Sequence, residues 1–126
     1  MKAPNVVDSS GWLEYLADTP RARLFATAIE DAASLLVPVI CLHEVFKKVR
    51  RERGENDALQ VLAVMQSGRV VPVDEALALA AARFDLPLAD SLIYATAQRE
   101  GAVLWTQDEH FKELPGVRFF ARPAAA

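Results

Sequence analysis

The chain has 126 residues, of which 52% are hydrophobic and 25% are charged, and its formal net charge is −3. A chain of this length can bury a core without disulfides, so we expect one domain over residues 1–126, with a frayed tail at about 122–126. The negative net charge argues against a uniformly basic surface for nucleic acids, although it leaves room for a local one.

The cysteine content and the hydropathy pattern indicate a cellular compartment. The single cysteine, Cys41, cannot form an internal disulfide, which suits a reducing cytoplasm. Because it lies in an apolar run, we expect a small buried side chain rather than a nucleophile. The N-terminus lacks the apolar core of a secretory signal, and no apolar run approaches the ~20 residues of a membrane span. We therefore expect a cytoplasmic protein with no membrane contact.

The first half of the chain alternates short apolar strands with helices. In chain order we predict a strand over 5–8, helices over 11–17 and 18–33, a strand over 34–40 and a helix over 39–53. Ser9 or Ser10 can cap the first helix. Pro20 suits the first turn of the second helix, and Gly54 ends the third.

The second half repeats this alternation. We predict a helix over 55–68, a strand over 69–73, helices over 75–85 and 86–101, a strand over 102–106, a short helix over 109–114 and a strand over 116–121. Gly68 and Gly101 end two of these helices, and Pro87 lies at the entry of one. The strand over 102–106 is the clearest in the chain.

This alternation predicts an α/β fold, a three-layer sandwich in which a short parallel sheet is covered by helices on both faces. Ligands of such sheets bind outside the carboxyl ends of the strands. Asp8 and Asp108 each follow a predicted strand, so we expect both at that edge. For either residue alone, a turn or a helix cap is the alternative.

Asp90 stands out because of its helical phase. Ile93, Tyr94 and Ala97 follow it at intervals of three, four and seven residues, so its carboxylate lies in line with an apolar stripe. A charge on a buried face needs a partner, because burying it unpaired costs several kcal/mol. The alternative is a first-turn aspartate held by a local hydrogen bond and the helix dipole.

Glu44 points away from the apolar stripe of its own helix. It shares a face with Lys48 and Arg51, so one interpretation is a solvated Glu–Lys pair. The other is that Glu44 borders a cleft from which Lys48 and Arg51 continue outward and contact RNA phosphates. A charge run of this kind is more often a solvated helix face.

Several acids gathered at one sheet edge would repel one another unless protons or a divalent cation lay between them. Oxygen ligands suit Mg²⁺ or Mn²⁺, whereas two histidines and one cysteine do not make a zinc set. Such a metal activates water for phosphodiester hydrolysis. Ser9 and Thr106 flank two of the acids, and their hydroxyls could hold the carboxylates in place.

Four segments together resemble a PIN domain, and most closely the VapC-type toxin ribonucleases of bacterial toxin–antitoxin pairs. They are "VVDSS" at 6–10, "VPVICLHE" at 37–44, "LPLADSLIYATA" at 86–97 and "AVLWTQDEHF" at 102–111. The resemblance implies a parallel α/β sandwich and a Mg²⁺- or Mn²⁺-dependent endoribonuclease that cuts RNA. It also implies a homodimer and a small antitoxin whose C-terminal segment covers the active site.

The resemblance also assigns roles to individual residues. The positions that match the family's catalytic and metal-binding acids are Asp8, Glu44, Asp90 and Asp108. Thr106 matches the threonine before the last acid, and Ser9 stands where threonine is frequent. His110 occupies a place where some members carry a further aspartate, which leaves a second metal position open; we expect an exposed histidine near the site.

Other interpretations remain open. Trp12, Leu13, Tyr15 and Leu16 are expected to pack in the core, with an antitoxin groove or a dimer seam as a hypothesis. RNA cleavage by His43 and His110 without a metal is a second enzymatic possibility. A phosphoacceptor receiver domain, or a catalytically degenerate PIN-like module that binds RNA or protein, would not be a nuclease.

Overall fold

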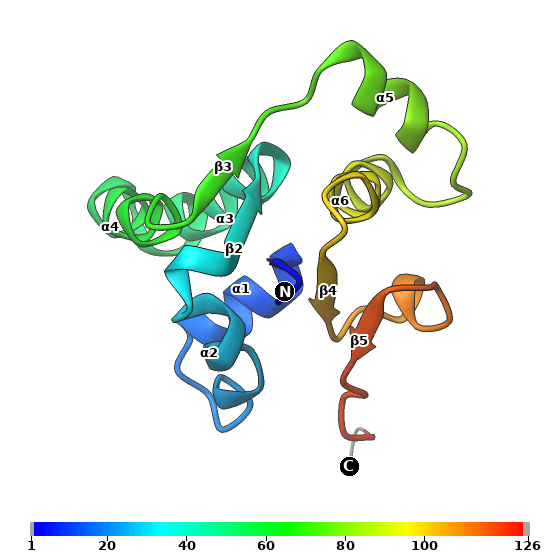
Figure 1. Cartoon of the computed structure of the whole chain (residues 1–126). Coiled ribbons are helices and arrows are strands. Elements are labelled where there is room, and N and C mark those ends of the chain that lie inside the picture. The colour runs from blue at the N-terminus through cyan, green and yellow to red at the C-terminus, as the bar shows by residue number, and fades with distance from the viewer. Residues whose placement is uncertain (1, 125–126) are drawn as a thin grey trace.

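A parallel sheet forms the centre of the molecule. The computed structural model describes residues 2–124, and its five strands lie in the order β3-β2-β1-β4-β5 (Figure 1). The strands are β1 (Asn5–Val7), β2 (Leu35–Pro38), β3 (Arg69–Val71), β4 (Val103–Thr106) and β5 (Val117–Phe119). Every neighbouring pair is parallel, which confirms the predicted sheet.

Helices flank this sheet and confirm the predicted α/β sandwich. They are α1 (Ser9–Leu16), α2 (Arg23–Ile29), α3 (Val39–Arg53), α4 (Glu55–Met65), α5 (Glu75–Ala81) and α6 (Leu88–Arg99). Two short 3₁₀ turns are η1 (Ala32–Ser34) and η2 (Glu109–Phe111). In Figure 1, α3 and α4 lie side by side near β2 and β3, and α5 lies against α6. None of the helices in the described residues has the length and apolarity to cross a bilayer.

The strand order bears on function. From β1 the chain moves outward through β2 and β3, then crosses to β4 and β5 on the other side of β1. The order therefore reverses between β1 and β4, which is where open parallel sheets bind ligands. A receiver-type sheet has the order 2-1-3-4-5. The receiver alternative is thus wrong for this chain.

The core confirms the helical phase predicted around Asp90. Ile93, Tyr94 and Ala97 are all buried in the principal core cluster. The Tyr94 hydroxyl donates a hydrogen bond to the carbonyl of Pro115, so its polar end is satisfied. Cys41 is also buried, as predicted, and burial raises the pKa of its thiol, which removes it as a nucleophile at neutral pH.

The helix predicted over 18–33 is too long. Only α2 is α-helical, because the segment before it forms three-residue turns in which the amide of Ala22 donates to the carbonyl of Thr19. The Thr19 hydroxyl accepts from the amide of Arg21 and holds this turn in place. After α2, Asp31 leaves the helical conformation with φ −93° and ψ 70° and leads into η1.

Smaller boundary differences occur elsewhere. The first helix begins at Ser9 because Asp8, rather than Ser9 or Ser10, is its cap. β3 ends at Val71, and α5 ends at Ala81, earlier than predicted. The predicted tail at about 122–126 lies partly outside the described residues, and residues 122–124 have no regular secondary structure.

Candidate active site

Two acids meet at the carboxyl ends of β1 and β4. The strands pair in register, with Val7 opposite Trp105, and the amide of Asp8 donates to the carbonyl of Trp105 at 3.2 Å. Asp108 follows two residues after β4 ends. Adjacent parallel strands therefore deliver both carboxylates to one edge of the sheet, at the point where the strand order reverses.

Asp8 is buried among neutral hydrogen-bond donors. Its side chain caps the N-terminus of α1, where Oδ1 accepts a hydrogen bond from the amide of Gly11 at 2.9 Å. The Ser10 hydroxyl lies 2.9 Å from both carboxylate oxygens, and the Thr106 hydroxyl donates to Oδ2 at 2.8 Å. Burial, with a smaller contribution from the charge of Asp108, raises the pKa of Asp8 to about 6 against these hydrogen bonds.

Gly11 permits this arrangement. A Cβ at that position would lie 2.7 Å from Val7 and 2.8 Å from the ring of Phe25. The first turn of α1 therefore approaches the end of β1 more closely than a residue with a side chain would allow. This close approach brings the Gly11 amide to the Asp8 carboxylate.

Thr106 joins the two strand-end acids. Its buried hydroxyl donates to Asp8 and accepts the backbone amide of Asp108 at 2.9 Å. Asp108 in turn caps η2 by accepting the amide of His110 at 2.9 Å. Both strand-end acids are thus helix caps, as the alternative held, and they also converge.

Asp90 reaches the same place from the first turn of α6. It is half-buried, and burial raises its pKa; the charge of Asp108, and to a smaller extent that of Glu44, also raises the pKa. Nδ1 of His110 lies 2.8 Å from Oδ2 of Asp90 and 3.1 Å from Oδ1 of Asp108. Donor atoms of these three residues all lie within 4.8 Å of one another.

Glu44 joins the cluster from α3. Its Oε1 accepts the Ser9 hydroxyl at 2.5 Å, which ties it to the residue after Asp8. Lys48 pairs with Glu52 at 3.2 Å, so the solvated Glu44–Lys48 pair, considered from the sequence, is not formed. Helical phase alone did not predict the position of Glu44. This residue is half-buried because α1 packs against α3, although Glu44 lies outside the apolar stripe of α3.

The donor set of this cluster fits a hard divalent cation. The donor atoms that lie within 4.8 Å of one another are carboxylate oxygens of Asp90 and Asp108 and a nitrogen of His110. Asp8 and Glu44 are near enough for their charges to interact with Asp108 and Asp90, respectively. Burial is the main cause of the raised pKa values of Asp8 and Asp90, and repulsion by the charge of Asp108 contributes to both. Mg²⁺ and Mn²⁺ prefer such oxygen ligands.

The sequence did not predict the contacts of His110. The side chain is 55% exposed, and it lies near the site as expected, but it faces two of the acids directly. The sequence feature that could have indicated these contacts is the position of His110 in a turn, two residues after Asp108. Lys48 and Arg51, the predicted RNA contacts, line two different grooves and are not brought together.

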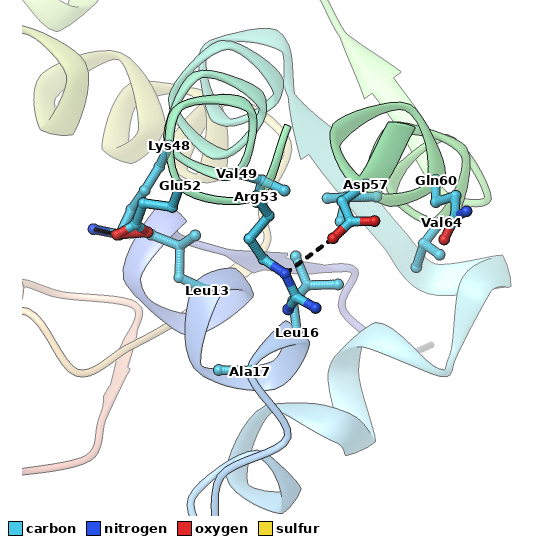
Figure 2. Close-up of a pocket in the computed structure, with 11 residues that line it drawn as sticks. Leu13, Leu16, Ala17, Lys48, Val49, Glu52, Arg53, Asp57, Gln60 and Val64 are labelled. Carbon is cyan, nitrogen blue, oxygen red and sulfur yellow. Dashed lines mark hydrogen bonds and ion pairs between the residues drawn. The ribbon is translucent and has the colours of Figure 1, made fainter. Parts of the chain in front are cut away.

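A separate groove of about 360 Å³ lies between α1, α3 and α4 (Figure 2). Leu13 and Leu16 line it from α1, and Val64 lines it from α4. Trp12 is fully buried in the core instead, and the Tyr15 hydroxyl donates to Glu30. None of the four acids lines this groove.

A family model for the PIN domain matches residues 6–117, which is most of the chain. The chain belongs to the PIN domain family. The match includes all four segments on which the resemblance depends. No curated protein sequence matches the chain in a direct comparison.

Solved structures from toxin–antitoxin systems share the fold of this PIN domain. A toxin–antitoxin complex from Klebsiella pneumoniae matches with a TM-score of 0.73 at 20% identity, covering 93% of this chain and 96% of that chain. Mycobacterium tuberculosis VapC20, described as a sarcin–ricin loop cleaving toxin, gives 0.71 at 21% identity, covering 88% and 95%. DNA-bound VapBC from Salmonella typhimurium gives 0.73 at 15% identity, covering 95% and 98%.

Proposed function

We propose that this PIN domain is a Mg²⁺- or Mn²⁺-dependent endoribonuclease and the toxin of a toxin–antitoxin pair. The observation that carries the proposal is the gathering of four acids, from four segments far apart in sequence, at the switch point of the sheet. RNA is the proposed substrate because a structural neighbour is described as cleaving the sarcin–ricin loop. The proposed setting is the cytoplasm, where RNA is available.

In this proposal the acids hold the cation and the attacking water. A bound divalent ion supplies an activated water and stabilises the charge that develops on the phosphate oxygens. Asp8, Asp90 and Asp108 hold the ion, and Glu44 contributes directly or through water. Thr106 and Ser9 hold Asp8 and Glu44 through their hydroxyls, so that the carboxylates do not need to reorganise when the substrate arrives.

The proposed partner is a small antitoxin, since two of the structural neighbours are toxin–antitoxin complexes. We assign its docking segment to the groove between α1, α3 and α4, where aliphatic side chains lie between exposed ion pairs. An apolar helix or strand with flanking polar residues fits such a surface. The homodimer stays a prediction, which light scattering on the purified chain tests.

The test is cleavage of a structured RNA by the purified chain in Mg²⁺, in Mn²⁺ and in EDTA. We expect cleavage with either metal, no cleavage in EDTA, and a loss of at least about 100-fold in Asp90→Asn. The matched control is Asp85→Asn, the same change at an exposed residue five positions earlier, which should cleave as the wild type does. Circular dichroism and thermal unfolding verify that both variants fold.

Three outcomes would contradict the proposal in different ways. Unchanged cleavage by folded Asp90→Asn refutes the assignment of the acids. Cleavage that survives EDTA favours histidine chemistry, although His43 lies in another groove, on the exposed face of α3, while His110 faces the acids. No cleavage under any condition, with RNA still bound, indicates the degenerate binding module.

A further inference from the structure

We propose that His110 is a direct nitrogen ligand in the acidic site and that it shifts the metal preference of this chain away from Mg²⁺ toward transition-metal ions. The inference rests on the proposed function, because it concerns the same cation site. It goes beyond that function, because neither the fold nor the set of four acids says which ion the site selects.

The position of the ring supports this role. Nδ1 of His110, rather than a carbon edge, faces Oδ2 of Asp90 and Oδ1 of Asp108, at 2.8 and 3.1 Å. Three donor atoms from two carboxylates and one imidazole thus lie within 4.8 Å of one another. Together these side chains would offer an ion a mixed set of imidazole nitrogen and carboxylate oxygens.

The backbone holds the ring there. The amide of His110 donates to Asp108, and the η2 turn that begins at Asp108 fixes the direction in which residue 110 leaves the backbone. The His110 side chain is 55% exposed, so its far edge can keep a water partner while Nδ1 faces the acids. A ligand fixed in this way loses little freedom when the ion enters.

The chemistry of the nitrogen donor sets the expected preference. Mg²⁺ prefers oxygen ligands in a strict octahedron, and an imidazole adds little to its binding. Transition-metal ions gain from imidazole, and affinity at a mixed nitrogen and oxygen site rises from Mn²⁺ toward Ni²⁺. A chain with histidine in place of a further carboxylate should therefore discriminate against Mg²⁺ more strongly than an all-acid site does.

A rival role for His110 makes the opposite prediction. A protonated His110 would be a counter-ion that neutralises Asp90 and Asp108 and competes with any added cation. Removing it would then strengthen the binding of every divalent ion, Mg²⁺ included. Removing a ligand instead weakens the binding of transition-metal ions and leaves Mg²⁺ nearly unchanged.

The experiment measures the binding of Mg²⁺, Mn²⁺ and Ni²⁺ to the full chain by calorimetry, without RNA. In His110→Ala we expect the Ni²⁺ affinity to fall by about tenfold or more, since even indirect partners of metal ligands contribute about 10–100-fold. The Mn²⁺ affinity should fall less, and the Mg²⁺ affinity by less than about twofold. His110→Asp should restore oxygen ligation and raise the Mg²⁺ affinity relative to Ni²⁺.

A spectroscopic measurement tests ligation directly. Pulsed electron paramagnetic resonance of the Mn²⁺ complex should show coupling to an imidazole nitrogen, and this coupling should disappear in His110→Ala. The matched control is His43→Ala, which removes the other histidine of the chain and should keep the coupling. Thermal unfolding checks that each variant is folded.

The outcomes separate this inference from the proposed function. If the wild type binds no divalent ion, both are overturned. If ions bind in a way that Asp90→Asn abolishes, but the wild type shows no nitrogen coupling, only the role of His110 is overturned. An equal ratio of Ni²⁺ to Mg²⁺ affinity in wild type and His110→Ala, or tighter Mg²⁺ binding in the variant, overturns it as well.

Discussion

The acidic edge of the sheet and the groove between α1, α3 and α4 both carry charged side chains. The partners of these charges differ between the two regions. In the groove, Lys48 pairs with Glu52 at 3.2 Å and Arg53 pairs with Asp57 at 3.0 Å (Figure 2). At the sheet edge, the buried Asp8 has only neutral donors, namely an amide and two hydroxyls.

This difference indicates which of the two regions would gain stability from a bound ion. Exposed ion pairs of the groove contribute about 0–1 kcal/mol each and leave no net charge behind. At the edge, Asp8 and Asp90 have raised pKa values because of burial and of the charge on Asp108, and His110 is the one basic side chain in contact there among the described residues. The charges of the groove are paired within the chain, whereas those of the edge would be stabilised by the proposed cation.

The pH dependence of the free energy of unfolding should show the cost of burying the charged form of Asp8 at the edge. In the folded chain Asp8 keeps its proton up to a pKa of about 6, whereas in the unfolded chain it loses it near 3.8. The native state therefore binds more protons between these values, and the free energy of unfolding falls as the pH rises from about 4 to 6. The expected loss is about 3 kcal/mol, measured by urea unfolding in EDTA.

Asp8→Asn is the matched variant for this prediction. Its amide oxygen can still accept the Gly11 amide, but it does not titrate, so most of the pH dependence should disappear. A smaller fall in the same direction should remain, because the pKa of Asp90 is raised as well. Added Mg²⁺ should offset the loss in the wild type and less so in the variant. An equally steep fall in Asp8→Asn would contradict the prediction.

Thr106→Val tests the neutral donors of the edge with a change of almost the same shape. The variant leaves the Asp108 amide without its acceptor and removes a donor from Asp8. Because both groups are at or near the buried end of β4, we expect a loss of about 1–3 kcal/mol in the free energy of unfolding. Thr27→Val, on the exposed face of α2, should stay within about 0.5 kcal/mol. Equal effects in the two variants would count against a special role for Thr106.

The sequence predicted the sheet and three of its acids for physical reasons that act locally. The apolar runs of the strands are short and are followed by polar residues, so Asp8 and Asp108 could be placed at the strand ends from the pattern alone. The phase of α6 placed Asp90 beside buried Ile93 and Tyr94, and this phase is fixed by 3.6 residues per turn. For Asp8 and Asp108, convergence at one edge then followed from the rule for parallel sheets.

What the sequence could not show depends on contacts between elements. Glu44 lies away from the apolar stripe of α3, and the Ser9 hydroxyl of α1 donates a hydrogen bond to its carboxylate. His110 faces Asp90 only because η2 turns the chain back toward α6. The second helix was predicted too long, since a turn held by the Thr19 hydroxyl replaces its first residues. Each of these depends on tertiary geometry rather than on periodicity.

The last and smallest of the expected effects concerns the groove. Val64 is 43% exposed and lines the groove from α4, so Val64→Glu should fold normally while placing a charge where an apolar partner segment would pack. We expect about a tenfold weaker affinity for the proposed antitoxin, equal to about 1.4 kcal/mol, with RNA cleavage unchanged. The control is Leu79→Glu, at an exposed position of α5 outside this groove, which should bind normally. Equal antitoxin binding by wild type and Val64→Glu would move the docking surface elsewhere, and a loss of cleavage in Val64→Glu would show that the groove and the acidic edge are not independent.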